Sequence, residues 1–181
     1  MFRVTRRYEF AASHRLHSGE LSDEENRRLY GKCNNPYGHG HNYVVEVSVR
    51  GPLEGATGRA VDIAILDELV AREVVRPLDH HDLNREVAVF ASVVPTLGNV
   101  KKQPLPDGRG SDSASEPRPG YPPGVGSGPL VPTSENLGLE ICRRLKRNWK
   151  QVFPGEWPKL EKIRIGETAR NIFEVGADEI E

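Results

Sequence analysis

The stretch Cys33–Tyr43 reads CNNPYGHGHNY and contains one of the two cysteines and two of the six histidines of the chain. One glycine separates His39 from His41, and an apolar alternation follows them as far as Val49. If the period of two of a β-strand includes both histidines, their imidazoles point to the same side of a sheet. Two such imidazoles can bind a transition metal, and one more ligand would complete a catalytic zinc site with an open position.

A third histidine is available upstream, at His14 or at His17. We favour His14, which follows an alternating stretch directly, whereas His17 lies toward a polar, glycine-containing turn. Three neutral imidazoles would leave zinc its full charge and a vacant position. Cys33 has two readings. Close to a metal its pKa would fall and give a reactive thiolate, but as a fourth ligand it would close a structural site. The spacing leaves both readings open.

Length and composition predict one cytoplasmic domain. The chain has 181 residues, within the usual size of a single domain. Its 25 Lys and Arg and 26 Asp and Glu give a net charge of -1, which offers no electrostatic argument for nucleic acid or an anionic membrane as a partner. We see no apolar segment typical of a secretory signal or a membrane helix. Two cysteines suit a reducing compartment.

Hydrophobic periodicity predicts an α+β fold with an antiparallel sheet. The alternating stretches predict strands at 2–10, 41–50, 160–165 and 171–175, and a short return strand at 59–61. Helical spacing and capping residues predict helices at 23–30, from Asp62 to just before Pro77, and at 134–153, with a loop at 78–84. The order strand, strand, helix, helix, strand, strand argues against a doubly wound fold.

Residues 98–130 differ in amino-acid composition from the rest of the single domain that we expect over residues 1–181. They hold seven of the 14 prolines and seven of the 18 glycines of the chain. Such a segment cannot bury enough apolar surface to offset the entropy lost on ordering, so we expect a disordered loop insertion. It contains no histidine or cysteine, and therefore no candidate metal ligand of that kind.

Three further groups could carry chemistry. Asp79 next to His80 would make a proton relay, although His81 and Asp82 offer the same pair and a polar loop is the simpler reading. Glu167, just past a predicted strand, could accept two hydrogen bonds from an amidine-like ring edge. The start of the long C-terminal helix could bind a ligand or serve only as a cap; its residues are Thr133, Ser134 and Glu135.

Taken in order, these motifs resemble the 6-pyruvoyltetrahydropterin and 6-carboxytetrahydropterin synthase family. The resemblance covers nearly the whole chain except 98–130, where the family passes directly to the helix. It rests on the segments FAASHRLH at 10–17, LSDEEN at 21–26, GKCNNPYGHGHNY at 31–43, PLDH at 77–80, PTSEN at 132–136 and Glu167-Thr168.

The resemblance implies the tunnelling fold, a four-stranded antiparallel sheet with two helices on one face. Subunits of that family join their sheets into a trimeric β-barrel, and two trimers form a homohexamer with active sites between subunits. It also implies 7,8-dihydroneopterin triphosphate as substrate. The implied site residues are zinc ligands His14, His39 and His41, a proton-transfer set Cys33, Asp79 and His80, and a pterin pocket of Glu167, Thr133, Ser134 and Glu135.

Three functions remain open from the sequence. The first is the zinc-dependent lyase that forms 6-pyruvoyltetrahydropterin with loss of triphosphate. The second is 6-carboxytetrahydropterin synthase of queuosine biosynthesis, whose members usually place three residues between the cysteine and the first histidine, where this chain has five, Asn34 to Gly38. The third is a non-catalytic zinc protein of the same fold. A patch formed by Arg15, Arg27, Arg28 and Lys32 could hold the triphosphate or be ordinary surface charge.

Overall fold

The computed structural model of the chain describes residues 1–91 and 129–180. Their strands form one five-stranded sheet in the order β3-β1-β2-β4-β5. The strands are β1 (Phe2–His14), β2 (His39–Gly51), β3 (His81–Asp82), β4 (Lys159–Gly166) and β5 (Ile172–Gly176). Most of the predicted insertion, 98–128, lies outside the described residues, whereas Leu130, its predicted end, is buried and donates a backbone hydrogen bond to Val89.

The two longest strands form the centre of the sheet. β1 and β2 pair antiparallel along their full lengths, from Phe2 opposite Gly51 to His14 opposite His39. Along β2 the residues from Tyr43 to Val49 alternate in direction, and Tyr43, Val45, Val47 and Val49 are buried on one face. Both strands run further toward the site than the predicted 2–10 and 41–50, so the histidines belong to the strands themselves.

The predicted sheet of four antiparallel strands is wrong in two details. β3, with only two residues, adds a fifth strand parallel to β1 at Ala12 and Ser13, so the sheet is mixed. The expected return strand at 59–61 does not form, and these residues belong to a loop. No closed barrel is formed by the described strands, because β3 and β5 remain separate edges.

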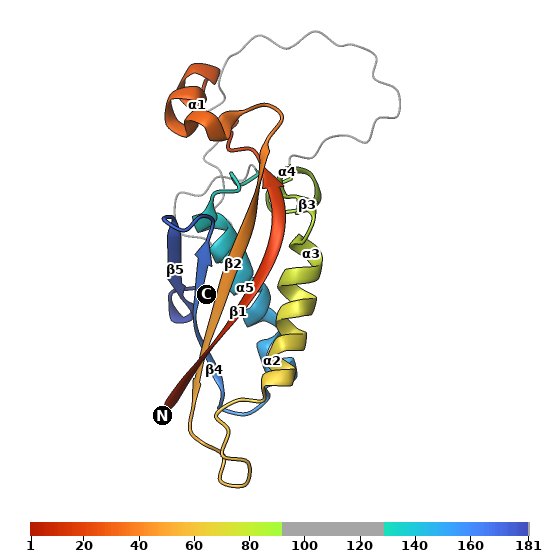
Figure 1. Cartoon of the computed structure of the whole chain (residues 1–181), viewed down its shortest axis with the longest axis vertical. Helices are drawn as coiled ribbons and strands as arrows, with labels where there is room; N and C mark the ends of the chain where they lie inside the picture. The colour runs from red at the N-terminus through yellow and green to blue at the C-terminus, as the bar shows by residue number, and fades with distance from the viewer. Residues whose placement is uncertain (92–128, 181) are drawn as a thin grey trace, which may run out of the picture.

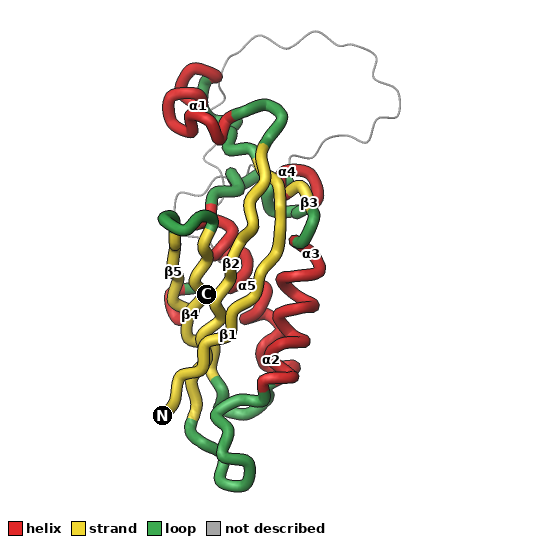
Figure 2. Tube along the Cα trace, viewed as in Figure 1, coloured by secondary structure: helices red, strands yellow, loops and turns green. Residues whose placement is uncertain are grey.

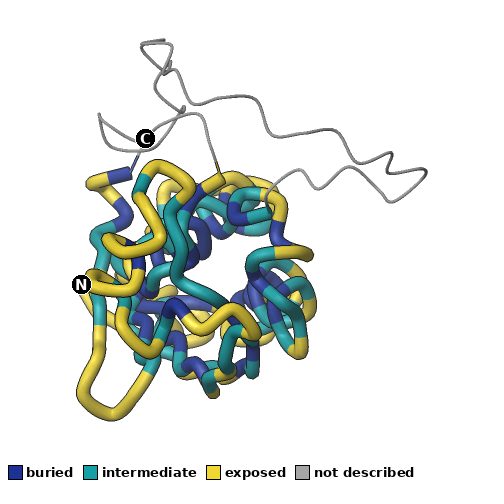
Figure 3. The backbone as a smooth tube through the Cα atoms, turned by 90° about the horizontal axis from the view of Figure 1, so that it is seen from above, coloured by how far each residue is buried: buried dark blue, intermediate teal, exposed yellow. Residues whose placement is uncertain are grey.

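The main helices cover one face of the sheet (Figures 1 and 2). They are α2 (Ile63–Val70), α3 (Arg76–Leu78) and α5 (Ser134–Val152), and a short α4 (Leu83–Glu86) lies in the predicted loop. α5 packs against β4 and α2, and buried residues of both helices face the strands across the core. In Figure 3 the exposed positions lie mostly on the outer loops and the buried ones mostly between the sheet and the helices. None of the helices in these described ranges is long and apolar enough to cross a membrane.

The predicted end of the second helix before Pro77 is wrong. The chain continues from α2 through a π-helical turn, η2 (Ala71–Val75), into α3, which contains the proline. A proline at this position cannot donate to the carbonyl of Glu73 four residues earlier. That carbonyl instead accepts a hydrogen bond from Nη1 of Arg144 at 3.5 Å. The wider turn and the external donor explain how the helix passes the proline.

A small helical unit at the end of β1 carries the cysteine. It consists of α1 (Asp23–Tyr30) with the predicted capping box at Ser22, followed by a 3₁₀ turn, η1 (Gly31–Asn34). Asn26 is fully buried and donates to the backbone carbonyls of three loop residues, which are Ser18, Leu21 and Ser22. The unit is tied to the strand end because Leu16 N donates to Cys33 O at 2.8 Å.

Candidate metal and active site

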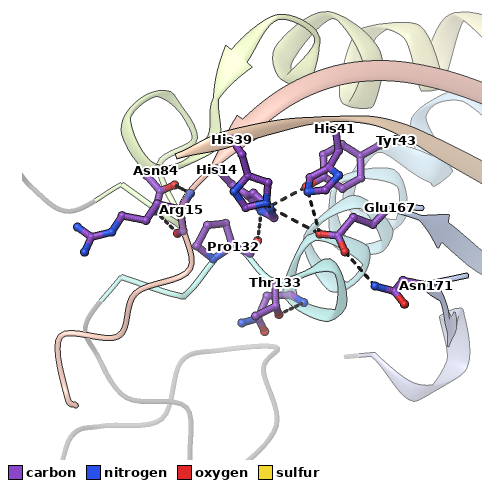
Figure 4. A network of polar contacts seen from close by, with 11 residues as sticks. His14, Arg15, His39, His41, Tyr43, Asn84, Pro132, Thr133, Glu167 and Asn171 are labelled. Carbon is purple, nitrogen blue, oxygen red and sulfur yellow. Dashed lines mark hydrogen bonds and ion pairs between the residues drawn. The ribbon is translucent and has the colours of Figure 1, made fainter. Parts of the chain in front are cut away.

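Three histidines meet where β1 ends and β2 begins (Figure 4). The pairing of His14 with His39 puts these side chains on one face, and His41 shares that face because it lies two residues further along β2. Their ligand nitrogens all lie within 4.8 Å of one another, and Nε2 of His14 is 3.3 Å from Nε2 of His39. The structure therefore brings together the three predicted metal ligands.

The surroundings keep these imidazoles suited to bind a cation. Nδ1 of buried His14 lies 2.8 Å from the carbonyl oxygen of Pro132, so Nδ1–H donates there and Nε2 keeps its lone pair. Burial lowers the pKa of His14 and of His39, which favours the neutral, metal-binding form. Nε2 of His41 is buried and has no hydrogen-bond partner among residues 1–91 and 129–180. A metal ion would satisfy that atom, and the residues present fit zinc.

Glu167 lies beside the histidines, immediately after β4 (Figure 4). Its Oε1 is 3.6 Å from Nε2 of His14 and 3.7 Å from Nε2 of His41, and its side chain is only 14% exposed. The backbone N–H of Glu167 donates to the carbonyl of Asn171, and Nδ2 of Asn171 lies 3.5 Å from Oε2. The carboxylate is therefore held at the edge of the metal site. Its predicted contact with a pterin ring stays a prediction.

Cys33 is partly buried on η1 and does not belong to the ligand cluster found among the described residues. Burial is the larger cause that raises the pKa of its thiol, and the negative charge of Glu167 is the second. The expected fall in this pKa is thus not produced by the protein groups alone, because burial and the nearby carboxylate of Glu167 both disfavour the thiolate. A cation between the three histidines would act in the opposite direction.

Asp79 and His80 form the pair that the sequence predicts. Oδ2 of Asp79 is 2.9 Å from Nδ1 of His80, while Oδ1 accepts a hydrogen bond from the backbone N–H of Ala11 at 2.8 Å. That backbone bond is the largest cause of the lowered pKa of Asp79. His80 has a positive φ of 61° and donates its own N–H to Ala11 O. Its imidazole is 82% exposed, and no hydrogen bond within the described ranges joins it to Cys33.

The competing pair is arranged differently. Nδ1 of His81 contacts the backbone carbonyl of Asp79, and its Nε2 faces Glu86 at 3.8 Å. Asp82 caps α4 through Asn84 N, and its ion pair within the described residues is with Arg85 at 3.6 Å. Asp79 with His80 is therefore the pair in which a carboxylate orients an imidazole.

The predicted pocket residues at the start of α5 and the alternative metal ligand His17 have different surroundings. Thr133 caps α5 through Asn136 N, and Glu135 is exposed. Ser134 is buried, and its Oγ forms no hydrogen bond within the described part of the chain. His17 is not a member of the ligand cluster found among the described residues, and its Nδ1 contacts Nδ2 of Asn34 at 3.1 Å and Nη2 of Arg15 at 3.3 Å.

Two contributors to the site were not predicted. Pro132 contributes a backbone carbonyl, which no side-chain pattern reveals. Tyr43 is fully buried with its hydroxyl 3.3 Å from Nδ1 of His14, and only its place on the apolar face of β2 could have indicated it.

Comparison with known proteins agrees with this geometry. The family model described as 6-pyruvoyl tetrahydropterin synthase matches residues 3–178. The chain belongs to this family. This confirms the resemblance seen in the sequence and supports the predicted enzyme class, a lyase of the 6-pyruvoyl tetrahydropterin synthase type.

Individual relatives give the extent of the likeness. The 6-pyruvoyl tetrahydrobiopterin synthases of Homo sapiens and Poecilia reticulata are 53% and 52% identical over 97 residues, which span 54% of this chain and 67% and 66% of theirs. The solved structure of Caenorhabditis elegans 6-pyruvoyl tetrahydropterin synthase matches 97% of this chain and 94% of its own at 31% identity, with a TM-score of 0.68. A Plasmodium vivax 6-pyruvoyltetrahydropterin synthase, at 20% identity and a TM-score of 0.53, supports the fold alone.

The pKa of Cys33 provides a test of the site. In metal-free protein we expect the pH midpoint for alkylation of Cys33 to lie above that of an ordinary thiol, because burial and Glu167 both disfavour the thiolate. Glu167→Gln should lower the midpoint by removing the negative charge, and added zinc should lower it in the wild-type protein. The rate of iodoacetamide labelling against pH, measured in a Cys142→Ala background, reports both shifts. An unchanged midpoint in both cases would contradict this electrostatic description.

Proposed function

We propose that this chain is a zinc-dependent lyase that converts 7,8-dihydroneopterin triphosphate into 6-pyruvoyltetrahydropterin with elimination of triphosphate. The observation that carries the proposal is the cluster of three histidines with Glu167 at its edge. A non-catalytic zinc protein would need neither the partly exposed thiol of Cys33 nor the Asp79–His80 pair.

His14, His39 and His41 would hold the zinc ion through their Nε2 atoms. When bound, the ion would supply a Lewis acid that lowers the pKa of the hydroxyl groups of the substrate side chain. The three neutral ligands would leave its double positive charge uncompensated apart from the nearby carboxylate of Glu167. This arrangement suits catalysis, because a site that is closed by a thiolate would lack both the charge and the vacant position.

Cys33 is the proposed base. As a thiolate it would remove a carbon-bound proton from the side chain of the substrate, and the electron pair left behind would move into the ring, which takes up a proton. Triphosphate would leave in a separate elimination, in which loss of a second carbon-bound proton from the side chain supplies the electron pair for the new double bond as the C–O bond to triphosphate breaks. His80 would return a proton, and Asp79 prepares it for this role by engaging Nδ1 and leaving Nε2 as the exchanging atom. The side chain is oxidised and the ring reduced within one molecule, so the reaction needs no redox cofactor.

Glu167, with the start of α5, is the proposed pterin pocket. A carboxylate can accept two parallel N–H bonds from the amidine edge of a pterin, and that of Glu167 is mostly shielded from water. The buried, unpartnered hydroxyl of Ser134 is a further candidate hydrogen-bonding group, while Thr133 and Glu135 would line the same pocket.

The length of the turn before His39 favours the pyruvoyl product. Five residues, Asn34 to Gly38, separate Cys33 from His39. The turn is closed by Gly38 N donating to Asn35 O, and Gly38 has a φ of 70°. A Cβ at this position would lie 3.0 Å from the carbonyl oxygen of His14, so the turn packs directly against the strand that carries a metal ligand. The 6-carboxytetrahydropterin product of queuosine biosynthesis is the alternative, and it would be accompanied by acetaldehyde.

The edges of the sheet support assembly into a homohexamer. β1 pairs with β3 only at Ala12 and Ser13, so that no other described strand covers the rest of its outer edge, and β5 is the opposite edge. Long unpaired edges favour pairing with another chain, and head-to-tail pairing of three copies would close a barrel. The exposed imidazole of His80 could then complete a site in a neighbouring subunit. We place this assembly in the cytoplasm, where its free cysteines would stay reduced.

The variant Cys33→Ala distinguishes a role of Cys33 as a general base from a role as a zinc ligand. With zinc-loaded protein and 7,8-dihydroneopterin triphosphate, we expect turnover to fall about 10²- to 10⁴-fold, since a general base is lost. Zinc content should stay unchanged. Mass spectrometry identifies the product of the wild-type protein, and metal analysis measures zinc in both proteins. Loss of zinc from Cys33→Ala would make the thiol a ligand, a carboxypterin would favour the alternative enzyme, and an intact substrate would overturn the catalytic proposal.

The hexamer is tested by mass in solution. Sedimentation equilibrium should give six times the 20.2 kDa of one chain. A proline at Arg7, on the β1 edge, should shift the population to smaller species if it blocks pairing between chains. A monomeric wild-type protein with full turnover would contradict a site shared between subunits.

A further inference from the structure

The orientation of His14 depends on a short segment that is distant in the sequence. Its Nδ1–H donates to Pro132 O at 2.8 Å, and this bond leaves Nε2 facing the other two histidines. Hydrogen bonds of this kind set the tautomer and ring orientation of metal-binding histidines. The direction of one backbone carbonyl, at Pro132, is therefore a property of the metal site.

The Pro132 carbonyl is held by a tight turn. Thr133 N donates to Val131 O at 2.8 Å, a bond between residues two apart that makes a γ-turn centred on Pro132. The proline ring suits this turn because it restricts φ to about −65°. Upstream, Leu130 is buried and its N–H donates to Val89 O at 3.0 Å.

Asn136 reinforces this turn from the first turn of α5. Its Nδ2 donates to Val131 O at 2.9 Å, so the carbonyl that closes the γ-turn accepts two hydrogen bonds. Its backbone N–H separately donates to the capping oxygen of Thr133 at 3.3 Å, and a change of the side chain at Asn136 would leave that cap in place. The side-chain amide thus acts on the turn and not on the helix cap.

We propose that Asn136 is a positioning residue for the metal site, which it serves by fixing the Val131–Thr133 turn so that Pro132 O holds His14 in the Nδ1–H tautomer. The inference rests on the proposed zinc site. Without the amide the turn keeps only its γ-turn bond, the direction of Pro132 O is held less firmly, and His14 loses part of its preference for one tautomer.

The test compares zinc affinity in Asn136→Ala with that in a matched control. Asn148→Ala removes an asparagine from the same helix whose Nδ2 also donates to a backbone carbonyl, that of Arg144 at 3.2 Å. Competition with a chromophoric chelator should show about 10- to 100-fold weaker zinc binding in Asn136→Ala and no change in the control. If alanine prevents folding, Asn136→Asp serves instead, because it keeps the side-chain size but removes the N–H donor.

A second measurement uses the metal-free protein. Imidazole ¹⁵N shifts should show one Nδ1–H tautomer for His14 in the wild-type protein and a mixture of tautomers in the Asn136 variants. Zinc affinity within about threefold of wild type, or an equal loss in Asn148→Ala, would overturn the proposal. A wild-type protein that does not bind zinc would contradict the proposed function, while the tautomer measurement would still test the role of Asn136.

Discussion

The antiparallel register between the end of β1 and the start of β2 is the constraint on which the site depends. His14 opposite His39 is the last pair of a ladder that begins at Phe2 opposite Gly51. A shift of one residue would turn His14 to the other face of the sheet and separate it from His39 and His41. The buried side chains further along the strands oppose such a shift, since it would expose them. The hydrophobic core therefore sets the geometry of the metal ligands.

The site has one part on the central strands of the sheet and another on the helical unit at the end of β1. The three histidines lie on the core face of the central strands, where burial lowers the pKa of His14 and of His39. Cys33 lies on the helical unit, which is connected to the strand end by the hydrogen bond from Leu16 N and by the turn of Gly38. The thiol can therefore lie close to the metal ligands while remaining outside the ligand cluster. This division agrees with a base that works beside a metal.

Side-chain patterns were sufficient to predict most of this arrangement. The alternation around His39 and His41 placed both on one face, and the end of the first strand made His14 a better ligand than His17. The capping residues Ser22 and Asp62 also began helices as expected. The resemblance to the family added the proposed roles of Cys33 and Glu167, which spacing alone did not decide.

The errors have local physical causes. The helix passes Pro77 because a π-helical turn and Arg144 replace the missing hydrogen bond, and Arg144 is too distant in sequence to be foreseen. β3 has only two residues, too few to show a period. Pro132 acts through a backbone carbonyl 118 residues from His14, which leaves no trace in side-chain chemistry.

X-ray absorption spectroscopy of the zinc-loaded protein tests most directly the claim that the thiol of Cys33 works beside the metal. Zinc bound by nitrogen has ligand distances of about 2.0–2.1 Å, whereas a thiolate lies at about 2.3 Å. The account predicts three imidazole nitrogens with one oxygen donor and no sulfur. A sulfur scatterer at about 2.3 Å that disappears in Cys33→Ala would contradict it.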